Sequence, residues 1–146
     1  MIDRRRATAP VCYAPADGPP PVLLLAGEGV SAGIARKFVR DHFQFELPDA
    51  SSEYIDAVEL VTCELVTNAI RYGTAAGDLM RVEIDVQDAR TRVEVEDPVR
   101  RRPQPRPESH ENEGGRGLII LDALCSDWGV TDTPSGKKVW AKVTAQ

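Results

Sequence analysis

Closely spaced cysteines and histidines are missing from the sequence. Its 3 Cys and 2 His are scattered over 146 residues, and no two cysteines form a C-x-x-C pair. Protein zinc sites use Cys and His ligands at short, regular spacing. The pattern therefore argues against a zinc site, and we interpret the thiols as buried or incidental.

Long hydrophobic runs are missing as well. The longest apolar stretches, at 21–26 and 117–121, are far shorter than the roughly 20 residues that span a bilayer. The N-terminal segment carries Arg4, Arg5 and Arg6 but lacks the apolar stretch and the small-residue cleavage site of a secretory signal. These absences predict a cytoplasmic protein that does not enter the membrane.

The sequence also has no excess of basic charge. Its net charge is −5 at pH 7, from 18 Lys and Arg against 23 Asp and Glu. A general nucleic-acid binder has a basic surface, so the charge disfavours that class and favours a neutral or basic partner. The composition, 42% hydrophobic and 28% charged, is typical of a soluble globular protein with one core.

The chain is expected to hold one folded domain at 21–146, after an N-terminal arm at 1–20 and with a lid at 98–114. The arm contains four prolines and little hydrophobic pattern, which predicts a mobile segment. The lid segment also contains four prolines, with basic residues at 100–102 and 106 and then acidic residues at 108, 111 and 113. Such a long segment without periodicity is typical of a functional lid or a disordered loop.

Hydrophobic periodicity predicts an α+β fold. Spacing of three and four residues indicates helices, and alternation indicates strands. The predicted helices lie at 31–43, 54–72 and 118–124. The predicted strands lie at 22–25, 80–86, 92–96, 128–130 and 138–143. This order predicts a two-layer sandwich, in which helices cover one face of a mixed, mainly antiparallel sheet.

Local signals mark the ends of the first two helices. Ser31 is expected to cap the first one, with Ile34 and Phe38 facing the core. A serine pair at 51–52 is expected to cap the second helix, which Gly73 then ends.

Two polar residues interrupt the apolar side of the helix at 54–72. Asn68 lies within the apolar arc and Glu64 lies on its edge, one turn earlier. A buried amide or carboxylate without a partner costs about 1–3 kcal/mol or more. Either both side chains bond to loop backbone, or they face a pocket where the amide oxygen holds a hard cation and the carboxylate polarises a water or hydroxyl.

Three glycines precede the predicted helix at 118–124. Gly114, Gly115 and Gly117 leave backbone N–H groups accessible at a helix start, an arrangement that binds phosphate in many proteins. Ordinary loops also use glycine, so this feature alone leaves both interpretations open.

Three separated stretches together resemble the GHKL ATPases. They are ELVTNAIRYG at 64–73, VED at 95–97 and GGRGLIILDAL at 114–124. With DWGV at 127–130 and GKKVW at 136–140, the chain looks like the stand-alone histidine-kinase-like regulators, which include the anti-sigma-factor serine kinases of bacterial partner switching. The resemblance implies a Bergerat-type ATP-binding fold over nearly the whole domain.

The resemblance also implies a site for ATP and Mg²⁺. In it Asn68 would hold the magnesium ion, Glu64 would act as general base, and Asp97 would accept a hydrogen bond from the adenine amino group. The triphosphate would be wrapped by the backbone of Gly115 and Gly117. Further contacts to phosphate or to a partner are expected from Arg71, Arg116 and Leu118.

Two features depart from the family pattern. The family motif usually follows its aspartate with glycines, whereas Pro98 follows Asp97 here and predicts a looser adenine pocket with weaker nucleotide affinity. In many relatives a hydroxyl residue supports the adenine end, and Lys138 is expected at that position.

The resemblance implies a regulator of transcription with a sigma factor and an anti-sigma-factor antagonist as partners, and a homodimer as its assembly. It implies a protein serine/threonine kinase. The alternative is a non-catalytic module in which nucleotide controls a protein-binding surface.

Overall fold

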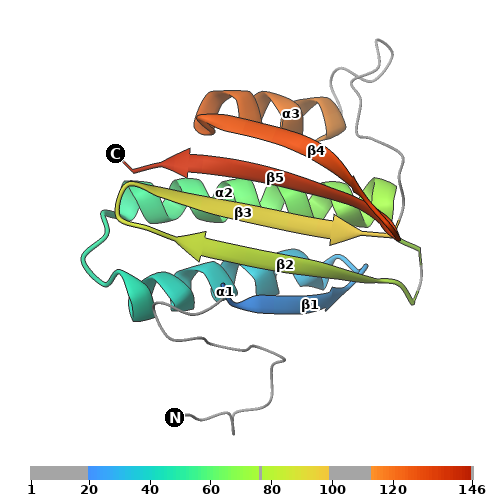
Figure 1. The fold of residues 1–146 in the computed structure, drawn as a ribbon, viewed down its shortest axis with the longest axis horizontal. Coiled ribbons are helices and arrows are strands. Elements are labelled where there is room, and N and C mark those ends of the chain that lie inside the picture. Colours follow the sequence, from blue (N-terminus) through green and yellow to red (C-terminus); the bar gives the residue numbers. More distant parts are fainter. Residues whose placement is uncertain (1–19, 76, 99–112, 146) are drawn as a thin grey trace, which may run out of the picture.

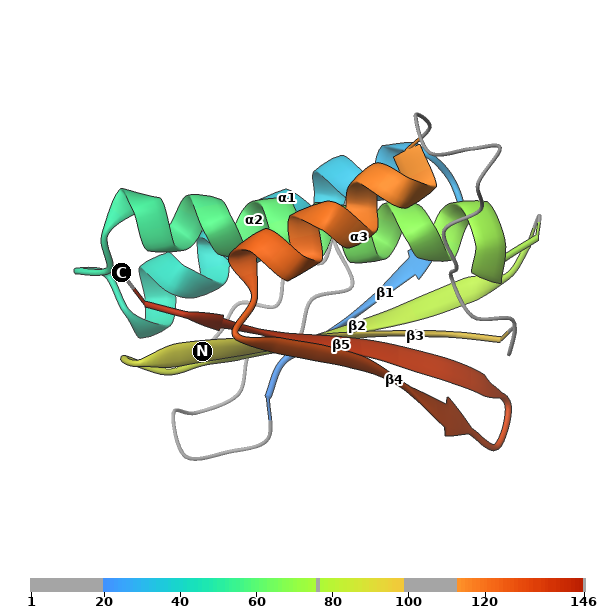
Figure 2. The same cartoon turned by 90° about the horizontal axis from the view of Figure 1, so that it is seen from above.

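The structure is a computed structural model that describes residues 20–75, 77–98 and 113–145. These residues form two layers, an open sheet and a layer of helices on one of its faces (Figure 1, Figure 2). The predicted α+β sandwich is therefore confirmed. Residues 1–19 of the predicted arm and residues 99–112 of the predicted lid lie outside the described part.

The helical layer consists of three α-helices and one π-helical turn. They are α1 at Val30–Glu46, α2 at Ser52–Asn68, the π-helical turn η2 at Ala69–Gly73, and α3 at Glu113–Leu124. Ser51 caps α2, since its side-chain oxygen accepts a hydrogen bond from the Tyr54 backbone N–H at 3.1 Å. The predicted cap and the predicted end of this helix at Gly73 are confirmed.

Five strands form one sheet in the order β1-β2-β3-β5-β4. The strands are β1 at Val22–Ala26, β2 at Leu79–Val86, β3 at Arg90–Asp97, β4 at Asp127–Thr133 and β5 at Gly136–Thr144. Each pair of neighbours is antiparallel. β3 and β4 run in the same direction, but β5 lies between them (Figure 1). The described sheet is thus antiparallel throughout, where the sequence predicted some mixed pairing.

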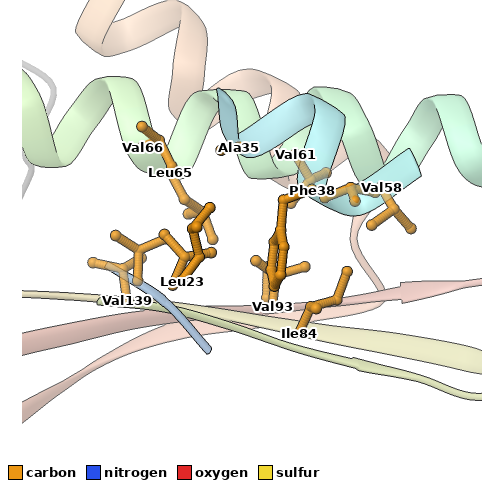
Figure 3. Close-up of a cluster of buried hydrophobic side chains, with 14 of the residues drawn as sticks. Leu23, Ala35, Phe38, Val58, Val61, Leu65, Val66, Ile84, Val93 and Val139 are labelled. Carbon is orange, nitrogen blue, oxygen red and sulfur yellow. The ribbon is translucent and has the colours of Figure 1, made fainter. Parts of the chain in front are cut away.

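The core lies between the two layers. Val58, Val61 and Leu65 of α2 face Ile84 and Val93 of the sheet across this space (Figure 3). All five side chains are at most 1% exposed. The alternation that predicted the β2–β3 hairpin therefore marks its buried face correctly.

The start of α1 differs from the sequence prediction. Ser31 does not cap the helix; its hydroxyl donates to the Ala26 carbonyl oxygen at 2.6 Å, which ties the helix start to β1. Ile34 is 40% exposed, whereas Phe38 is buried as predicted. The inner face repeats from Ala35 at helical spacing, so Ile34 falls outside it.

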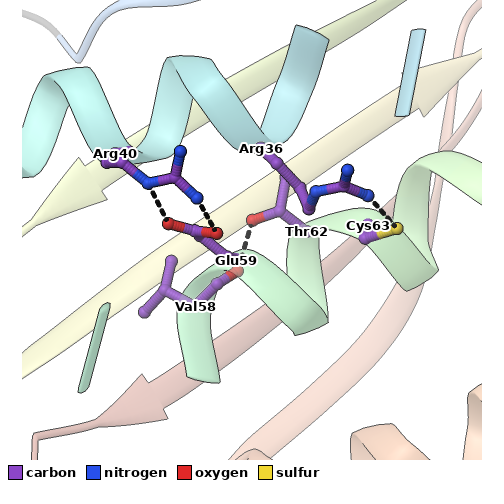
Figure 4. A network of polar contacts seen from close by, with 6 residues as sticks. All are labelled: Arg36, Arg40, Val58, Glu59, Thr62 and Cys63. Atoms are coloured by element: carbon purple, nitrogen blue, oxygen red, sulfur yellow. Dashed lines mark hydrogen bonds and ion pairs between the residues drawn. The ribbon is translucent and has the colours of Figure 1, made fainter. Parts of the chain in front are cut away.

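Polar contacts join α1 to α2 at the surface (Figure 4). The guanidinium of Arg40 donates to both carboxylate oxygens of Glu59, at 2.8 and 2.9 Å. Arg36, one turn earlier in α1, donates to the sulfur of Cys63, one turn later in α2, at 3.6 Å. The Arg40 side chain is 62% exposed, so the pair contributes modestly to stability and mainly fixes the alignment of the two helices.

None of the helices in the described ranges is both long and apolar enough to span a membrane.

Buried His42 makes the stability of this fold depend on pH. Burial lowers the pKa of His42 from 6.5 to about 4, and the charge of Asp85 offsets only part of this effect. The unfolded chain takes up a proton near pH 6.5 that the folded chain resists until about pH 4. The contribution is therefore complete above the unfolded pKa and is lost as the pH falls from 6.5 toward 4.

We expect the free energy of unfolding to be about 2 kcal/mol lower at about pH 5 than at about pH 7.5 because of this one group. Urea unfolding at both pH values measures the loss, and His42→Phe should remove most of it. An equal loss of stability in the variant would show that other groups cause it.

Candidate functional site

One end of the sandwich brings together the end of α2, the end of β3 and the start of β5 (Figure 1). A small cavity lies at this junction. The helical residues that line it are Leu65, Asn68, Ala69 and Tyr72, and the strand residues are Val95, Asp97, Lys137 and Val139. Two of the predicted site residues, Asn68 and Asp97, therefore share one cavity.

Asn68 is the polar residue on the helical wall of this cavity. It is 6% exposed, and its amide nitrogen is buried without a hydrogen-bond partner in the described residues. A buried unpaired amide group is unusual and costs about 1–3 kcal/mol. The structure therefore does not show the alternative in which this nitrogen donates a hydrogen bond to loop backbone. Glu64 lies one turn earlier on α2 and is half-buried.

The helix widens immediately after Asn68. Residues Ala69–Gly73 form a π-helical turn, a feature that occurs frequently at functional sites. The hydroxyl of Thr74 then donates to the carbonyl oxygens of Ala69 and Ile70, at 3.1 and 3.3 Å, and closes the helix end. In this turn Tyr72 contributes to the cavity wall, while Arg71 is exposed and outside the cavity lining.

Asp97 is paired with a lysine that the sequence analysis did not select. The Lys137 ammonium donates to both carboxylate oxygens of Asp97, at 3.0 and 3.1 Å. The two side chains are 3% and 1% exposed, Lys137 first. The expected residue, Lys138, instead points to the other face of the sheet and pairs with Glu94 at 3.2 Å. The lysine next to Asp97 is thus Lys137, which corrects the prediction.

The alternation of β5 could have identified this lysine. Lys137 has the same parity as Val139 and Val143, which are buried against the helices. Lys138 has the parity of Trp140 and lies on the opposite face. The signal in the sequence is a charged residue at a position of β5 where the alternation places apolar side chains. The sequence does not show which residue of β3 pairs with it, because that depends on the register between two strands far apart in the chain.

The β4–β5 turn presses directly on the end of β3. A Cβ atom added at Gly136 would lie 1.9 Å from the Asp97 carbonyl oxygen and 2.6 Å from the Pro98 Cα atom. Real Cβ atoms do not approach backbone so closely, so only glycine fits this position without movement. The contact holds Lys137 directly opposite Asp97 in the strand pairing.

The two ends of the site differ in how well they fit a nucleotide with magnesium. The buried amide nitrogen of Asn68 has no partner in the described residues, which fits a bound ligand at this end of the site. The cavity at Asp97 does not fit a nucleobase in this conformation, since its volume is about 10 Å³. That is room for about one water molecule, whereas pockets for small molecules have volumes of about 300–1,000 Å³.

The glycine-rich segment lies inside α3 rather than before it. The helix begins at Glu113, so Gly115, Arg116, Gly117 and Leu118 all belong to its first two turns. Glycine disfavours a helix by only about 1 kcal/mol per residue, which does not prevent such a start. The first four N–H groups of any helix lack acceptors within it, and this end of α3 lies at the same end of the molecule as the end of α2 (Figure 2). The predicted glycine loop is therefore wrong, while backbone N–H groups of α3 remain available.

The comparisons with known proteins agree with this fold. Residues 29–143 match the family model described as the histidine kinase-like ATPase domain. The chain therefore belongs to the histidine kinase-like ATPase family, and the resemblance to GHKL ATPases is confirmed. Membership in this family implies ATP binding. No curated protein matched the sequence.

Two similar solved structures come from one bacterial protein. The Erythrobacter litoralis EL346 blue-light activated histidine kinase is 20% identical with a TM-score of 0.53, over 80% of this chain and 41% of that one. The histidine kinase domain of the same protein is 20% identical with a TM-score of 0.50, over 92% of this chain and 66% of that one. At this identity the likeness shows the fold, and the chain spans less than two thirds of either structure.

We predict that Gly136→Ala destabilises the domain by about 1–3 kcal/mol, because the new methyl group overlaps the backbone of Asp97 and Pro98. Gly33→Ala is the matched control. Its added Cβ would meet nothing closer than 3.9 Å in exposed α1, so it should stabilise by about 0.5–1 kcal/mol. Urea unfolding measures both, and an unchanged midpoint for Gly136→Ala would show that this turn is not tightly packed.

Proposed function

We propose that this chain is an ATP-binding regulator that acts as an anti-sigma factor. It would phosphorylate a serine or threonine of an anti-sigma-factor antagonist and bind a sigma factor in the alternate state of a partner-switching pathway. A cytoplasmic location and a homodimer belong to the same proposal. Family membership and the unpartnered amide of Asn68 support it.

The amide of Asn68 carries the proposal. Its nitrogen is buried without a partner at the end of α2, on the wall of the cavity that also contains Asp97. An orphaned polar group is retained where something outside the fold completes it. The orphaned nitrogen is a donor, so an acceptor such as a phosphate oxygen would complete it. The oxygen of the same amide is a suitable ligand for a hard cation such as Mg²⁺.

Each residue of the site would have a separate role in phosphoryl transfer. Bound MgATP supplies the phosphoryl group and the cation that neutralises its charge. Asn68 would hold that cation, and the backbone N–H groups at the start of α3 would receive phosphate oxygens. Glu64, one turn before Asn68, would accept the proton of the attacking hydroxyl. Arg71 is exposed beside the site, where it would contact a partner or a phosphate.

The second candidate is a non-catalytic module in which nucleotide only changes a protein-binding surface. The pairing of Asp97 with Lys137 favours it, because this pair fills the position expected to recognise adenine. Nucleotide would then bind weakly and turn over little. The same chain would still need Asn68 for binding, so the two candidates differ in catalysis and not in the cation site.

We expect Asn68→Ala to abolish the stabilisation of the protein by MgATP. A ligand at about 100 times its Kd adds about 2.7 kcal/mol to the stability of the folded state, which raises the melting temperature by several degrees. Without nucleotide the variant should lose little stability, because the nitrogen it removes has no partner. Thermal unfolding with and without MgATP measures both effects, with Thr67→Ala as the control. A full shift in Asn68→Ala would contradict the cation role.

Glu64→Gln should keep MgATP binding and slow phosphoryl transfer by about 10²–10⁴-fold, the usual contribution of a general base. Transfer of labelled γ-phosphate to an antagonist protein, or release of free phosphate, measures the rate. Glu53→Gln, an exposed glutamate in the first turn of the same helix, is the control. Binding without turnover in the parent protein would favour the non-catalytic module.

A further inference from the structure

We propose that Lys137 locks the nucleobase end of the site, so that an adenine nucleotide binds fully only after the Lys137 ammonium leaves the Asp97 carboxylate. This inference rests on the proposed function, because it takes Asp97 as the residue that meets the nucleobase. It adds a residue that sets nucleotide affinity and to which the resemblance assigns no role.

The first support is the geometry of the pair. Both oxygens of Asp97 accept hydrogen bonds from the Lys137 ammonium, at 3.0 and 3.1 Å. Both residues are almost fully buried, at 3% and 2% exposed, Asp97 first. A nucleobase amino group would have to compete with a full positive charge for these oxygens. In a buried environment that competition strongly favours the charge.

The second support is the lack of space. The cavity beside the pair has a volume of about 10 Å³, and its walls include Tyr72, Val95 and Val139. A flat nucleobase therefore cannot lie against Asp97 while the lysine side chain remains in place. Withdrawal of the four-carbon stem of Lys137 would free both the carboxylate and the space next to it.

The third support is that the backbone around the pair is fixed. Gly136 packs against the Asp97 carbonyl oxygen so closely that an added methyl group would lie 1.9 Å from it. Asp97 and Lys137 are also direct partners in the β3–β5 ladder. The strands cannot easily separate, so the flexible side chain of Lys137 is the part that can move.

The lock should weaken the apparent affinity for ATP. A minor conformation a few kcal/mol above the major one is populated at about 0.1–10%, and the apparent Kd is the intrinsic Kd divided by that fraction. Removing the lock should therefore lower the Kd for MgATP roughly tenfold or more. A ligand without a nucleobase should gain nothing, because it does not need the space at Asp97.

The experiment compares MgATP with magnesium tripolyphosphate by isothermal titration calorimetry. Lys137→Met keeps most of the stem and removes the charge. Lys137→Gln keeps an amide donor for Asp97 and serves as the second variant if the first does not fold, which circular dichroism checks. Lys138→Met is the matched control, because this neighbour lies on the opposite face and pairs with Glu94.

The expected result is a Kd for MgATP at least about tenfold lower in a folded Lys137 variant, with the tripolyphosphate Kd and the Lys138→Met protein unchanged. The lock is supported equally if a Lys137 variant binds ATP measurably and the parent protein does not. Equal or weaker ATP binding in the variants, with clear binding in the parent, overturns the lock and leaves the proposed function standing. Absence of ATP binding in the parent and in both variants overturns the two together. A parallel gain for tripolyphosphate also overturns the lock, since the effect would then be general charge.

Discussion

Helix α2 lies over the middle of the sheet, where its apolar side packs against β3 and β5 (Figure 3). Val61 and Leu65 belong to this contact, and the positions that follow at helical spacing are Asn68 and Tyr72. An amide at such a position cannot turn to solvent unless the helix leaves the sheet. The packing of α2 therefore forces Asn68 into the cavity wall, and its buried nitrogen is a consequence of how the core is built.

The sheet imposes a matching constraint from the other side. Asp97 ends the buried row that contains Val93 and Val95, and Lys137 begins the buried row that contains Val139. The β3–β5 register places the two charges opposite one another. Breaking such a pair by removing one partner typically costs about 3–5 kcal/mol, because the other charge stays buried. Each of the two residues neutralises the buried charge of the other. The pair therefore contributes to the stability of the core and is also part of the candidate site.

Much of this arrangement could be predicted from the sequence because its signals are local. The periods of α2 and of the β2–β3 hairpin identified both elements and their buried faces. Asn68 was recognisable as a polar residue on an apolar arc, and Asp97 as part of a motif at the end of a strand. The start of α3 was not predictable in this way, since three glycines favour a loop locally while the structure continues the helix through them.

The role of Lys137 shows why a motif describes only part of a binding site. Lys137 and Asp97 are 40 residues apart, and their contact depends on the pairing of β3 with β5, between which α3 and β4 lie in the sequence. The neighbouring Lys138 matches the expected position equally well by sequence, but strand alternation turns it to the other face. Alternate residues of β5 face opposite sides of the sheet, so moving the buried lysine by one residue along β5 would remove the charge beside Asp97. The motifs at 64–73, 95–97 and 114–124 would stay unchanged. Nucleotide affinity in such a domain is thus set partly by residues that become visible only when the register of the sheet is known.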